Sequence, residues 1–495
     1  MTAENLDNDL ASVAAVIVLA AGSGKRMKSS KSKLLHEVCG KTLLHYAVSA
    51  GAALDPAHLV VVVGQFREQV TEHLGQLSTS VTTALQDEQL GTGHAVSCGL
   101  EDLGDVSGEV VVTYGDVPLL TGDTLRRLVA VHRAHENGVT VLTAHVNDPT
   151  GYGRIMREGD KVVGIVEHRD ASEEQRRINE INSGIYVFDA ETLRSGLAQL
   201  GTDNAQGEQH LTDVVHLAHT RGDKVGAVVT DDVWQTEGVN DRVQLARINA
   251  EMNRRILDAW MLAGVTIINP ASTFIDVDVD LAQDVVLMPG TILQGATTIG
   301  QGAIIGPDTS LIDVEVGANA EVVRTHGSFA IIEEGAQVGP FSYLRPGTQL
   351  GRDGKIGAFV ETKNAVIGEG SKLPHLAYCG DAFVDDGVNI GAGTIFANYD
   401  GVNKSVTHVG KGAFVGSNSV LVAPVDIAAG GFVAAGSAVT EDVPAGGLAI
   451  ARGRQHTAKG WVTRRRPGSK AAQAAEAHDG SIHPAVVESR SQQKG

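Results

Sequence analysis

The amino-acid sequence predicts two folds in one chain: an α/β domain with a mostly parallel sheet, followed by a parallel β-helix. In the first half, short aliphatic runs alternate with segments of helical period, which is the pattern of βαβ units. After Gly264, aliphatic residues recur every six residues instead. Aromatic residues make up only 4% of the 495 residues, beside 59 glycines, which fits a thin, repetitive core over part of the chain.

The α/β domain is expected over residues 1–240. Its strands are expected at 16–19, 59–63, 110–113, 139–143 and 185–188, and two of its helices at 43–53 and 121–136. Parallel strands joined by helices present their carboxyl ends at one edge of the sheet, and ligands bind there. The turns that follow the strands are therefore the places to search for a site.

One helix is expected to connect the two folds, over residues 241–264. Its apolar residues recur three or four positions apart and form a single stripe. The stripe consists of Leu245, Ile248, Met252, Ile256 and Trp260. Gly264 follows as a typical helix stop.

The β-helix is expected over residues 265–460. A strict six-residue step fits one short strand per hexapeptide, with each aliphatic side chain pointing into a narrow core. The step is obeyed by Ile332, Val338, Leu344, Leu350, Ile356, Ile367, Leu373, Cys379, Val409, Val415, Leu421, Ile427, Val433 and Val439. Glycine often follows the aliphatic residue, at Gly339, Gly351, Gly357, Gly368, Gly410 and Gly416. We expect it to supply corner conformations that other residues resist.

Three segments depart from this repeat. The step breaks near residues 324–331 and 391–408, and loops are expected to project there. The last segment, residues 461–495, is rich in Ala, Ser, Gln and Gly beyond Arg466 and is expected to be disordered.

The charge balance and the cysteines exclude several classes of function. Lys plus Arg number 40 against 59 Asp plus Glu, a net charge of −19, which repels nucleic-acid phosphates and anionic lipids. We therefore expect no nucleic-acid and no membrane partner. Cys39, Cys98 and Cys379 are too far apart for a disulfide framework or a CxxC metal site. We expect Cys98 and Cys379 to be core residues.

The apolar run at residues 11–21 is not expected to be a targeting segment. Glu4, Asp7 and Asp9 precede it, where a secretory signal needs positive charge. The run is also too short to span a bilayer. The sequence therefore predicts a cytoplasmic protein.

A glycine-rich turn, LAAGSGKRM at residues 19–27, follows the first strand. Its two glycines let backbone N–H groups approach a phosphate, and Lys25 and Arg26 add positive charge. The P-loop motif fails because Leu19 stands where it needs glycine. The dinucleotide fingerprint fails because Met27 replaces its last glycine or alanine.

Further polar residues follow the next strands. Lys33 lies shortly after the turn, Gln86 and the Gly-Thr pair at 91–92 follow a third strand, and Tyr-Gly-Asp at 114–116 ends a fourth. An aspartate at a strand's carboxyl end, facing a phosphate-binding turn, is the hard oxygen ligand that Mg²⁺ takes. The alternative is that Asp116 only caps the helix that follows.

These motifs resemble a known family. LAAGSGKRM, Lys33, LGTGHA at 90–95 and YGD at 114–116 resemble the sugar-1-phosphate nucleotidylyltransferases. With the hexapeptide repeats, the chain from about Val16 to Arg466 resembles the bacterial bifunctional N-acetylglucosamine-1-phosphate uridylyltransferases / glucosamine-1-phosphate N-acetyltransferases. The resemblance implies a Rossmann-like nucleotidyltransferase domain and a left-handed β-helix.

The resemblance also implies a nucleotide site. Leu19, Ala20, Ala21 and Gly22 would hold the nucleotide, Gln86, Gly91 and Thr92 the uracil, and the catalytic cations Arg26 and Lys33 the triphosphate. Tyr114, Gly115 and Asp116 would complete the site, Gly153, Glu167 and Asn182 would hold the sugar, and Asp116 and Asn240 would bind Mg²⁺. The chain departs from the family at Ser32, where proline is usual. We expect this change to loosen the turn but to keep the charge of Lys33.

One stretch of the β-helix is richer in polar groups than a scaffold needs: Arg345, Lys363, His375, Tyr378, Asn389, Asn398 and Tyr399. Alone, His375 reads as a surface histidine. The resemblance makes it the general base, a role that its unperturbed pKa of about 6.5 suits. Arg345 and Lys363 would bind the sugar phosphate, and Tyr378 and Asn389 the sugar. Acetyl-CoA would lie against Ala392, Asn398, Tyr399, Ser417, Ala435 and Arg452, although small residues such as Ala392 also suit tight corners.

The implied function is two reactions of UDP-N-acetylglucosamine biosynthesis, which feeds the cell wall. Glucosamine-1-phosphate would be acetylated by acetyl-CoA, and UMP would then pass from UTP to N-acetylglucosamine-1-phosphate, with Mg²⁺ as cofactor and a homotrimer as the assembly. One alternative is a nucleotidylyltransferase with a scaffolding β-helix, which leaves His375, Lys363 and Arg345 unexplained. The other is a non-enzymatic regulatory scaffold, which predicts a degraded metal and phosphate site.

Overall fold

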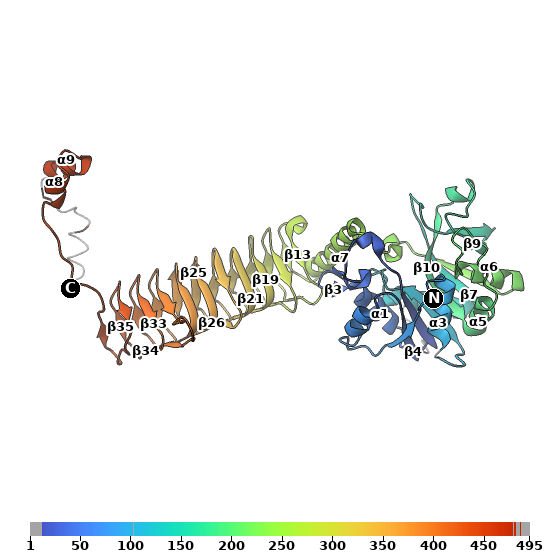
Figure 1. Cartoon of the computed structure of the whole chain (residues 1–495), viewed down its shortest axis with the longest axis horizontal. Helices are drawn as coiled ribbons and strands as arrows, with labels where there is room; N and C mark the ends of the chain where they lie inside the picture. The colour runs from blue at the N-terminus through green and yellow to red at the C-terminus, as the bar shows by residue number, and fades with distance from the viewer. Residues whose placement is uncertain (1–11, 102, 479, 482–485, 487–495) are drawn as a thin grey trace.

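The computed structural model describes residues 12–101, 103–478, 480–481 and 486 (Figure 1). An α/β domain stands at one end, a long β-helix extends away from it, and helix α7 (Arg242–Leu262) lies at their junction. Both expected folds are confirmed. The first part is a Rossmann-like α/β domain, and the second is a left-handed parallel β-helix of hexapeptide repeats.

The α/β domain is built on a nine-stranded sheet whose main path has the order β11-β7-β10-β6-β1-β4-β5. The strands are β1 (Ala15–Ala20), β4 (His58–Val63), β5 (Thr82–Leu85), β6 (Glu109–Tyr114), β7 (Val139–His145), β8 (Arg154–Glu158), β9 (Lys161–Val166), β10 (Glu180–Asp189) and β11 (Val225–Val229). β1 is parallel to β4 and β6, and β4 to β5, so these four strands end at one edge. β10 runs antiparallel to β6 and β7.

Helices cover both faces of this sheet. They are α1 (Leu43–Ala52), α2 (Arg67–Leu74), α3 (Thr92–Glu101), α4 (Gly122–His135), α5 (Ala190–Leu197) and α6 (Thr212–Arg221). Buried residues of α1, α2 and α4 pack in one apolar cluster against the sheet, and those of α3, α5 and α6 in another. This three-layer arrangement leaves the edge at the carboxyl ends of the strands open for a ligand.

Helix α7 belongs to both parts of the molecule. Asp241 caps it by accepting from the N–H groups of Val243 and Gln244. Ile248 is buried against the α/β domain, while Leu257 is buried in the core of the β-helix. A short hairpin, β2 (Glu37–Val38) and β3 (Lys41–Thr42), also contacts the β-helix, because the Cys39 carbonyl in its turn accepts from the Val277 N–H at 3.0 Å. No helix in the described ranges is both long enough and apolar enough to cross a bilayer.

The β-helix forms two long parallel sheets. The eleven-stranded sheet consists of β12 (Thr266–Ile267), β15 (Val286–Leu287), β18 (Ile304–Ile305), β20 (Glu321–Val322), β22 (Gln337–Val338), β25 (Lys355–Ala358), β27 (Lys372–His375), β29 (Asn389–Ile390), β32 (Phe414–Val415), β35 (Phe432–Val433) and β37 (Leu448–Ala449). The fifteen-stranded sheet consists of β13 (Phe274–Ile275), β14 (Asp280–Leu281), β16 (Ile292–Gln294), β17 (Thr298–Ile299), β19 (Ser310–Val316), β21 (Thr325–Ile332), β23 (Ser342–Leu344), β24 (Thr348–Leu350), β26 (Glu361–Ile367), β28 (Tyr378–Val384), β30 (Ile395–Ala397), β31 (Thr407–Val409), β33 (Val420–Val422), β34 (Val425–Ile427) and β36 (Ala438–Val439).

The six-residue step identifies the core of the β-helix. All fourteen residues that obey it have side chains no more than 3% exposed, so the repeat reports the inward direction at every position. Cys379 is one of them and is buried as expected. Cys98 is different: it is only half-buried on α3, with its Sγ 3.7 Å from His94 Nε2, so the expectation of a core cysteine was wrong there.

The glycines of the repeat serve a different purpose from the expected corner conformation. Of the six, Gly339 alone has a left-handed φ, of +102°. At Gly368 and Gly410, an added Cβ would lie 2.7 and 2.6 Å from the backbone nitrogens of Asp386 and Ala429 in the next coil. Glycine is required there because neighbouring coils pass too close for any side chain.

The two breaks in the repeat have different causes. At 324–331 the expected loop is wrong, because strand β21 continues through it, and Phe329 turns the corner inside the strand with φ +47°. Glu321 pairs with Gln337, 16 residues on, whereas Gln337 pairs with Lys355, 18 residues on. A coil that is two residues shorter interrupts the six-residue step, just as an inserted loop would. At 391–408 a loop does leave the helix, between β30 and β31.

The expected disorder of residues 461–495 is wrong for part of the segment. It contains α8 (Trp461–Arg465) and α9 (Lys470–Ala477), the second capped by Ser469, which accepts from the Ala472 N–H. Alanine-rich composition also favours helix, which the disorder prediction overlooked. The rest of the segment, residues 479, 482–485 and 487–495, lies outside the described residues.

Candidate active sites

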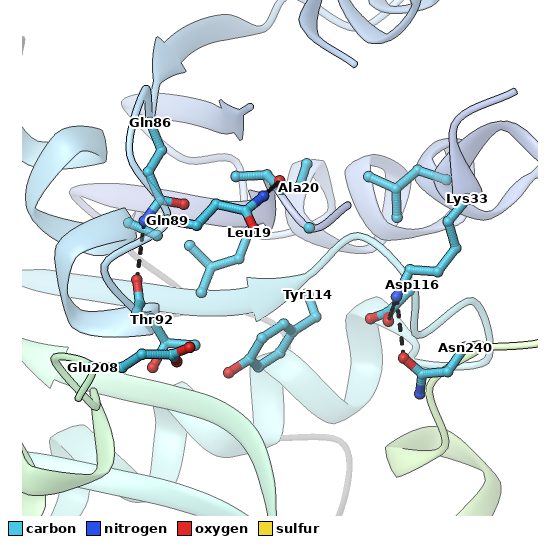
Figure 2. A pocket seen from close by; sticks show the side chains of 15 residues that line it. Leu19, Ala20, Lys33, Gln86, Gln89, Thr92, Tyr114, Asp116, Glu208 and Asn240 are labelled. Carbon is cyan, nitrogen blue, oxygen red and sulfur yellow. Dashed lines mark hydrogen bonds and ion pairs between the residues drawn. The ribbon is translucent and has the colours of Figure 1, made fainter. Parts of the chain in front are cut away.

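A pocket of about 330 Å³ lies at the carboxyl ends of the parallel strands (Figure 2). Eleven residues proposed from the sequence line it: Leu19, Ala20, Ala21, Gly22, Lys33, Gln86, Gly91, Thr92, Tyr114, Asp116 and Asn240. Leu34, Gln89, Ala95 and Glu208 complete the lining. Segments that are far apart in the chain therefore meet in one cavity.

The glycine-rich turn leaves room for ligand and for lysine. A Cβ at Gly22 would meet no atom within 4 Å, so the backbone there is open to an incoming group. Gly24 has φ +57°, and a Cβ on it would lie 2.8 Å from the Cβ of Lys33. Glycine at this position therefore lets Lys33 pack against the turn. Arg26, in the following short helix, is exposed and does not line the pocket.

Gln86 and its neighbours close the opposite end of the pocket. The buried Gln86 donates from Nε2 to the Gly91 carbonyl at 3.0 Å. Gly91 has φ +117°, and any side chain there would overlap the backbone of Gln209. Thr92 begins α3, and its Oγ1 accepts from the Leu211 N–H at 3.0 Å. The side-chain amide at 86 is thus held in a fixed orientation.

Sequence reasoning missed two polar residues of the lining. Gln89 donates from Nε2 to the Ala21 carbonyl at 2.9 Å and so joins the glycine-rich turn to the 86–92 segment. Its place within that segment was a signal that could have found it. Glu208 comes from the loop between α5 and α6, where no motif marks it.

Lys33 lies between two oxygen donors. Its Nζ is 2.5 Å from Asp116 Oδ2 and 3.3 Å from Asn240 Oδ1 (Figure 2). The Asp116 carbonyl also accepts from the Val239 N–H at 2.9 Å, which fixes the two acceptors relative to each other. The capping alternative for Asp116 is excluded, because Thr121 caps α4 by accepting from the Thr124 N–H.

This oxygen pair fits a hard divalent cation. The carboxylate of Asp116 and the amide oxygen of Asn240 already hold an ammonium between them, and such oxygens are the ligands that Mg²⁺ prefers, with phosphates and water supplying the rest. In the part of the chain that the structure describes, no group of three His, Cys, Asp or Glu side chains could hold a metal by itself. A cation at this pair would therefore depend on the substrate's phosphates.

Ser32 does not loosen the turn as expected. Its φ of −51° is close to the value that proline imposes. Its N–H, which proline lacks, donates to Gln69 Oε1 at 2.9 Å. Gln69 also donates from Nε2 to the Ser30 carbonyl at 3.1 Å. Two hydrogen bonds from one side chain thus hold the turn that carries Lys33.

The proposed sugar residues lie beside the pocket without lining it. The Asn182 N–H donates to the Gly153 carbonyl at 2.9 Å. Glu167 accepts from Thr212 Oγ1 at 3.2 Å, and burial raises the pKa of its carboxyl. Glu167 also acts on Tyr114 in the lining: burial raises the pKa of that phenol, and the nearby charges of Glu167 and Asp116 add to the rise. Gly115 was also proposed for the nucleotide site and does not line the pocket. Its N–H donates to the Leu19 carbonyl at 3.0 Å.

On the β-helix, five proposed residues form a column along one corner. Backbone bonds join each coil to the next: Gly393 N–H to His375 O at 3.2 Å, Asn418 N–H to Ala392 O at 2.7 Å, and Gly436 N–H to Ser417 O at 2.8 Å. Arg452 ends the column, with Nη1 donating to the Ala435 carbonyl at 2.8 Å. His375, Ala392, Ser417, Ala435 and Arg452 thus lie on successive coils, with an exposed imidazole at one end.

A cationic cluster lies on the face next to this corner. The Lys404 ammonium lowers the pKa of Lys363, and Arg345 acts on Lys363 in the same direction. Two acids belong to the cluster. Glu361 forms an ion pair with Arg345 at 3.0 Å, and although burial opposes it, bonds from Asn364 and Asn398 lower the pKa of the Asp381 carboxyl. Sequence reasoning missed Lys404, whose only signal was its place in the 398–406 loop.

The remaining proposed residues surround these two groups. Tyr378 begins β28, and its hydroxyl is 3.4 Å from Asn398 Nδ2. Asn389 is on the other sheet, paired with Lys372 and Phe414. Tyr399 is exposed in the 398–406 loop. The single chain therefore brings Arg345, Lys363, Tyr378 and Asn398 together but leaves Asn389 on a different face.

Comparison with known proteins identifies the family. The nucleotidyl transferase family model matches residues 15–243. The "Bifunctional protein GlmU" of Kineococcus radiotolerans is 54% identical over 464 residues, 94% of both chains. Those of Streptomyces avermitilis and Mycolicibacterium gilvum are 53% and 54% identical over 94% of this chain and 97% and 94% of their own. The chain therefore belongs to the GlmU family, the bifunctional acetyltransferases and uridylyltransferases of UDP-N-acetylglucosamine biosynthesis.

Proposed function

We propose that the two sites divide the two reactions between residues 1–240 and 265–460, with 241–264 as the linker. The observation that carries this proposal is the single pocket lined by Lys33, Asp116, Asn240 and the glycine-rich turn. UTP and acetyl-CoA are cytoplasmic metabolites, which supports a cytoplasmic location for the enzyme.

In uridylyl transfer, a phosphate oxygen of N-acetylglucosamine-1-phosphate attacks the α-phosphorus of UTP. A new P–O bond forms, and the bond to pyrophosphate breaks. Lys33 and Arg26 neutralise the negative charge of the triphosphate, while Gln86 and Thr92 orient the base. No side-chain nucleophile is needed, since positioning and charge neutralisation lower the barrier to in-line displacement.

Asp116 and Asn240 are the residues that would hold a divalent cation. GlmU-type nucleotidyltransferases generally use a divalent metal, and we assign Mg²⁺ here because the donors are a carboxylate and an amide oxygen. When bound, the ion polarises phosphate oxygens as a Lewis acid. On the sugar side, Gly153, Glu167 and Asn182 would bind the hydroxyl and acetamido groups.

In acetyl transfer, the amine of glucosamine-1-phosphate attacks the thioester carbonyl of acetyl-CoA. The C–N bond forms, the C–S bond breaks, and coenzyme A leaves as the thiol. His375 takes the proton of the amine as general base. The column of Ala392, Ser417, Ala435 and Arg452 suits an extended pantetheine arm, because its side chains are small until the terminal guanidinium.

The cationic cluster would hold the sugar phosphate of the acetyl-transfer substrate. Arg345 and Lys363 were proposed for this from the sequence, and Lys404 adds a third cation on the same face. Ammonium groups that repel one another gain most from an anion between them. Tyr378 and Asn389 would then bind the sugar, and Asn398 and Tyr399 the coenzyme.

A homotrimer is supported by an apolar corner of the β-helix. Phe341, Phe359 and Leu376 have φ of +61°, +58° and +51°, a conformation that costs roughly 1–2 kcal/mol for a residue other than glycine. Their side chains are 53%, 58% and 61% exposed, and the two rings stack at 5.2 Å. Large apolar groups at such positions suit burial against another copy. Leu376 follows His375 directly, so this contact would adjoin the acetyl-transfer site.

One incubation tests both reactions. The purified protein is mixed with glucosamine-1-phosphate, acetyl-CoA, UTP and Mg²⁺, and the products are identified by mass spectrometry. UDP-N-acetylglucosamine, free coenzyme A and pyrophosphate together would establish the proposal. If product forms only when N-acetylglucosamine-1-phosphate is supplied, the β-helix is a scaffold and His375 loses its role.

A further inference from the structure

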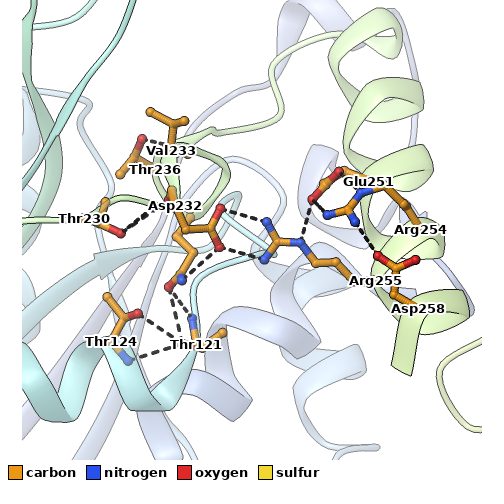
Figure 3. Close-up of polar contacts among 11 residues, drawn as sticks. Thr121, Thr124, Thr230, Asp232, Val233, Thr236, Glu251, Arg254, Arg255 and Asp258 are labelled. Carbon is orange, nitrogen blue, oxygen red and sulfur yellow. Dashed lines mark hydrogen bonds and ion pairs between the residues drawn. The ribbon is translucent and has the colours of Figure 1, made fainter. Parts of the chain in front are cut away.

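A polar network joins helix α7 to the segment that leads into the nucleotide pocket (Figure 3). Arg255 donates from Nη1 and Nη2 to the two carboxylate oxygens of Asp232, both at 2.8 Å. Its Nε donates to Glu251 Oε1, also at 2.8 Å. The adjacent Arg254 bonds to the same Glu251 and to Asp258, on the side of α7 away from Asp232.

The 232–240 segment runs from this ion pair to the metal-site oxygens. Asp232 begins it as the N-cap of a short helix, η5 (Val233–Thr236). At its far end, Val239 donates its N–H to the Asp116 carbonyl at 2.9 Å, and Asn240 lines the pocket. The segment is thus tied to α7 where it begins and to the Asp116 turn where it ends, and at that end the Asn240 N–H also donates to Gln244 Oε1 of α7 at 2.8 Å.

Gln235 adds a second tie in the middle of the segment. Its Nε2 donates to Asp232 Oδ2 at 3.1 Å. Its Oε1 accepts from the N–H and the Oγ1 of Thr121, both at 3.3 Å. Thr121 caps α4 at the end of the turn that carries Asp116. The Asp232 carboxylate is therefore where α7, the 232–240 segment and the Asp116 turn are joined.

We propose that Arg255 is a positioning residue for the Asp116–Asn240 oxygen pair, acting through Asp232 and the 232–240 segment. This inference rests on the proposed role of that pair as divalent-metal ligands. Arg255 touches neither ligand: at 1.5 Å per residue along α7 it lies roughly 20 Å from the start of the helix. It acts by fixing where the segment begins.

Removing the guanidinium has a local physical consequence. Glu251 would keep its ion pair with Arg254, but Asp232 would lose the cation that it shares with Glu251, and a partly buried carboxylate without its cation draws in water. The 232–240 segment would then lose its tie to α7 at its start, while it keeps the bonds of Gln235 to Thr121 and of Val239 to the Asp116 carbonyl. Loss of a group hydrogen-bonded directly to a metal ligand typically weakens metal affinity about 10- to 100-fold, and we expect a smaller effect here because Arg255 acts through Asp232 and the segment.

The first test measures the segment itself in the metal-free, full-length protein. Hydrogen–deuterium exchange is compared among wild type, Arg255→Met and Arg254→Met. The second variant is the matched control, because it also removes an arginine bonded to Glu251 on the same helix. We expect faster exchange across residues 233–240 in Arg255→Met only. Equal exchange in the two variants would overturn the proposal.

The second test measures Mn²⁺ binding in the presence of UTP, by electron paramagnetic resonance, and the Mg²⁺ dependence of uridylyl transfer. Arg255→Met should raise the half-saturating concentration of either metal by a few-fold, less than the loss of a direct partner of a ligand would, and Arg255→Lys should restore part of the affinity. Arg254→Met should match wild type. Acetyl transfer by the same samples should be unchanged, which controls for unfolding.

Asn240→Ala separates failure of this inference from failure of the proposed metal site. If Asn240→Ala weakens Mn²⁺ binding while Arg255→Met does not, the metal site stands and the positioning role falls. If Asn240→Ala leaves Mn²⁺ binding unchanged, the assignment of the ligands is itself wrong, and the positioning role falls with it.

Discussion

The α/β domain and the β-helix position their functional residues in opposite ways. In the α/β domain, parallel strands end at one edge, and residues as far apart as Leu19 and Asn240 meet in a pocket of about 330 Å³. On the β-helix, repetition stacks residues in a column from His375 to Arg452 along an open corner. The first candidate site is a pocket formed within one chain. The second is an exposed edge, which we propose gains depth when another copy of the chain faces it.

The largest expected effect separates the two sites. Asp116→Ala removes one of the two side chains that we propose as cation ligands, so UTP-dependent turnover should fall by at least about 100-fold. Acetyl transfer should be unchanged, because the residues proposed for it lie on the β-helix. Both rates are measured on the same purified, folded sample by product analysis. Loss of both activities would break the contrast between independent sites.

The converse substitution should have an effect of similar or smaller size. His375→Ala removes the proposed general base, and acetyl transfer at neutral pH should fall about 100-fold. Uridylyl transfer from N-acetylglucosamine-1-phosphate should match wild type. Steady-state rates of coenzyme A release and of pyrophosphate release report the two reactions separately. Wild-type acetyl transfer in the variant would remove His375 from the mechanism.

The apolar corner tests whether the open site needs a partner. The double change Phe341→Ser and Phe359→Ser removes two exposed rings that stack at 5.2 Å. We expect light scattering coupled to gel filtration to show smaller species, with acetyl transfer reduced several-fold and uridylyl transfer retained. The matched control is Phe383→Ser, another exposed ring, on strand β28 and away from this corner. An unchanged mass would show that the corner is not the contact.

One source of pH-dependent stability lies on the β-helix, at His408. Although burial opposes it, the carboxylates of Asp426 and Asp385 raise the pKa of His408 above its ordinary value of 6.5. A raised folded pKa gives stability that is fully present below about pH 6.5 and is lost as pH rises through the folded value. The melting temperature of the wild type should therefore fall as the pH rises above neutral, and this fall should be smaller in His408→Asn. An identical slope in the variant would refute this source.

The smallest expected effect concerns the turn that carries Lys33. Gln69→Ala removes the acceptor for the Ser32 N–H and a donor to the Ser30 carbonyl, so the KM for UTP should rise by a few-fold with kcat little changed. Adding Ser32→Pro should restore the KM, because proline fixes the φ that Ser32 already has. Additive losses in the double variant would contradict the idea that Gln69 replaces a proline.

The structure could be predicted best from the sequence where the same local pattern recurs at a constant spacing along the chain. The six-residue step identified core residues such as Leu344 and Val433, because each inward position is set by the strand alone. The purpose of Gly368 was misjudged, since the close approach of Asp386 comes from the next coil. The burial of Cys98 was overestimated, because a helical period does not show how much of the helix face other elements cover.

The site was predicted least where contacts come from distant parts of the chain. Glu208 and Lys404 lie in loops, whose paths no periodicity determines. The Arg255–Asp232 pair joins residues on a helix and a separate loop, and neither belongs to a motif. By contrast, Lys33 and Asp116 were found because each follows a strand whose end the parallel sheet brings to a common edge.

The length of the eleven-stranded sheet also bears on how far the reaction intermediate has to travel. Strand β27, which ends at His375, is six steps from β12 in the sheet order, and at about 4.8 Å per step this is roughly 29 Å. If the two proposed sites are correct, we expect an acetylated sugar phosphate to leave the first site and mix with the surrounding pool before uridylylation. Unlabelled N-acetylglucosamine-1-phosphate added from outside should then dilute a label that enters as glucosamine-1-phosphate.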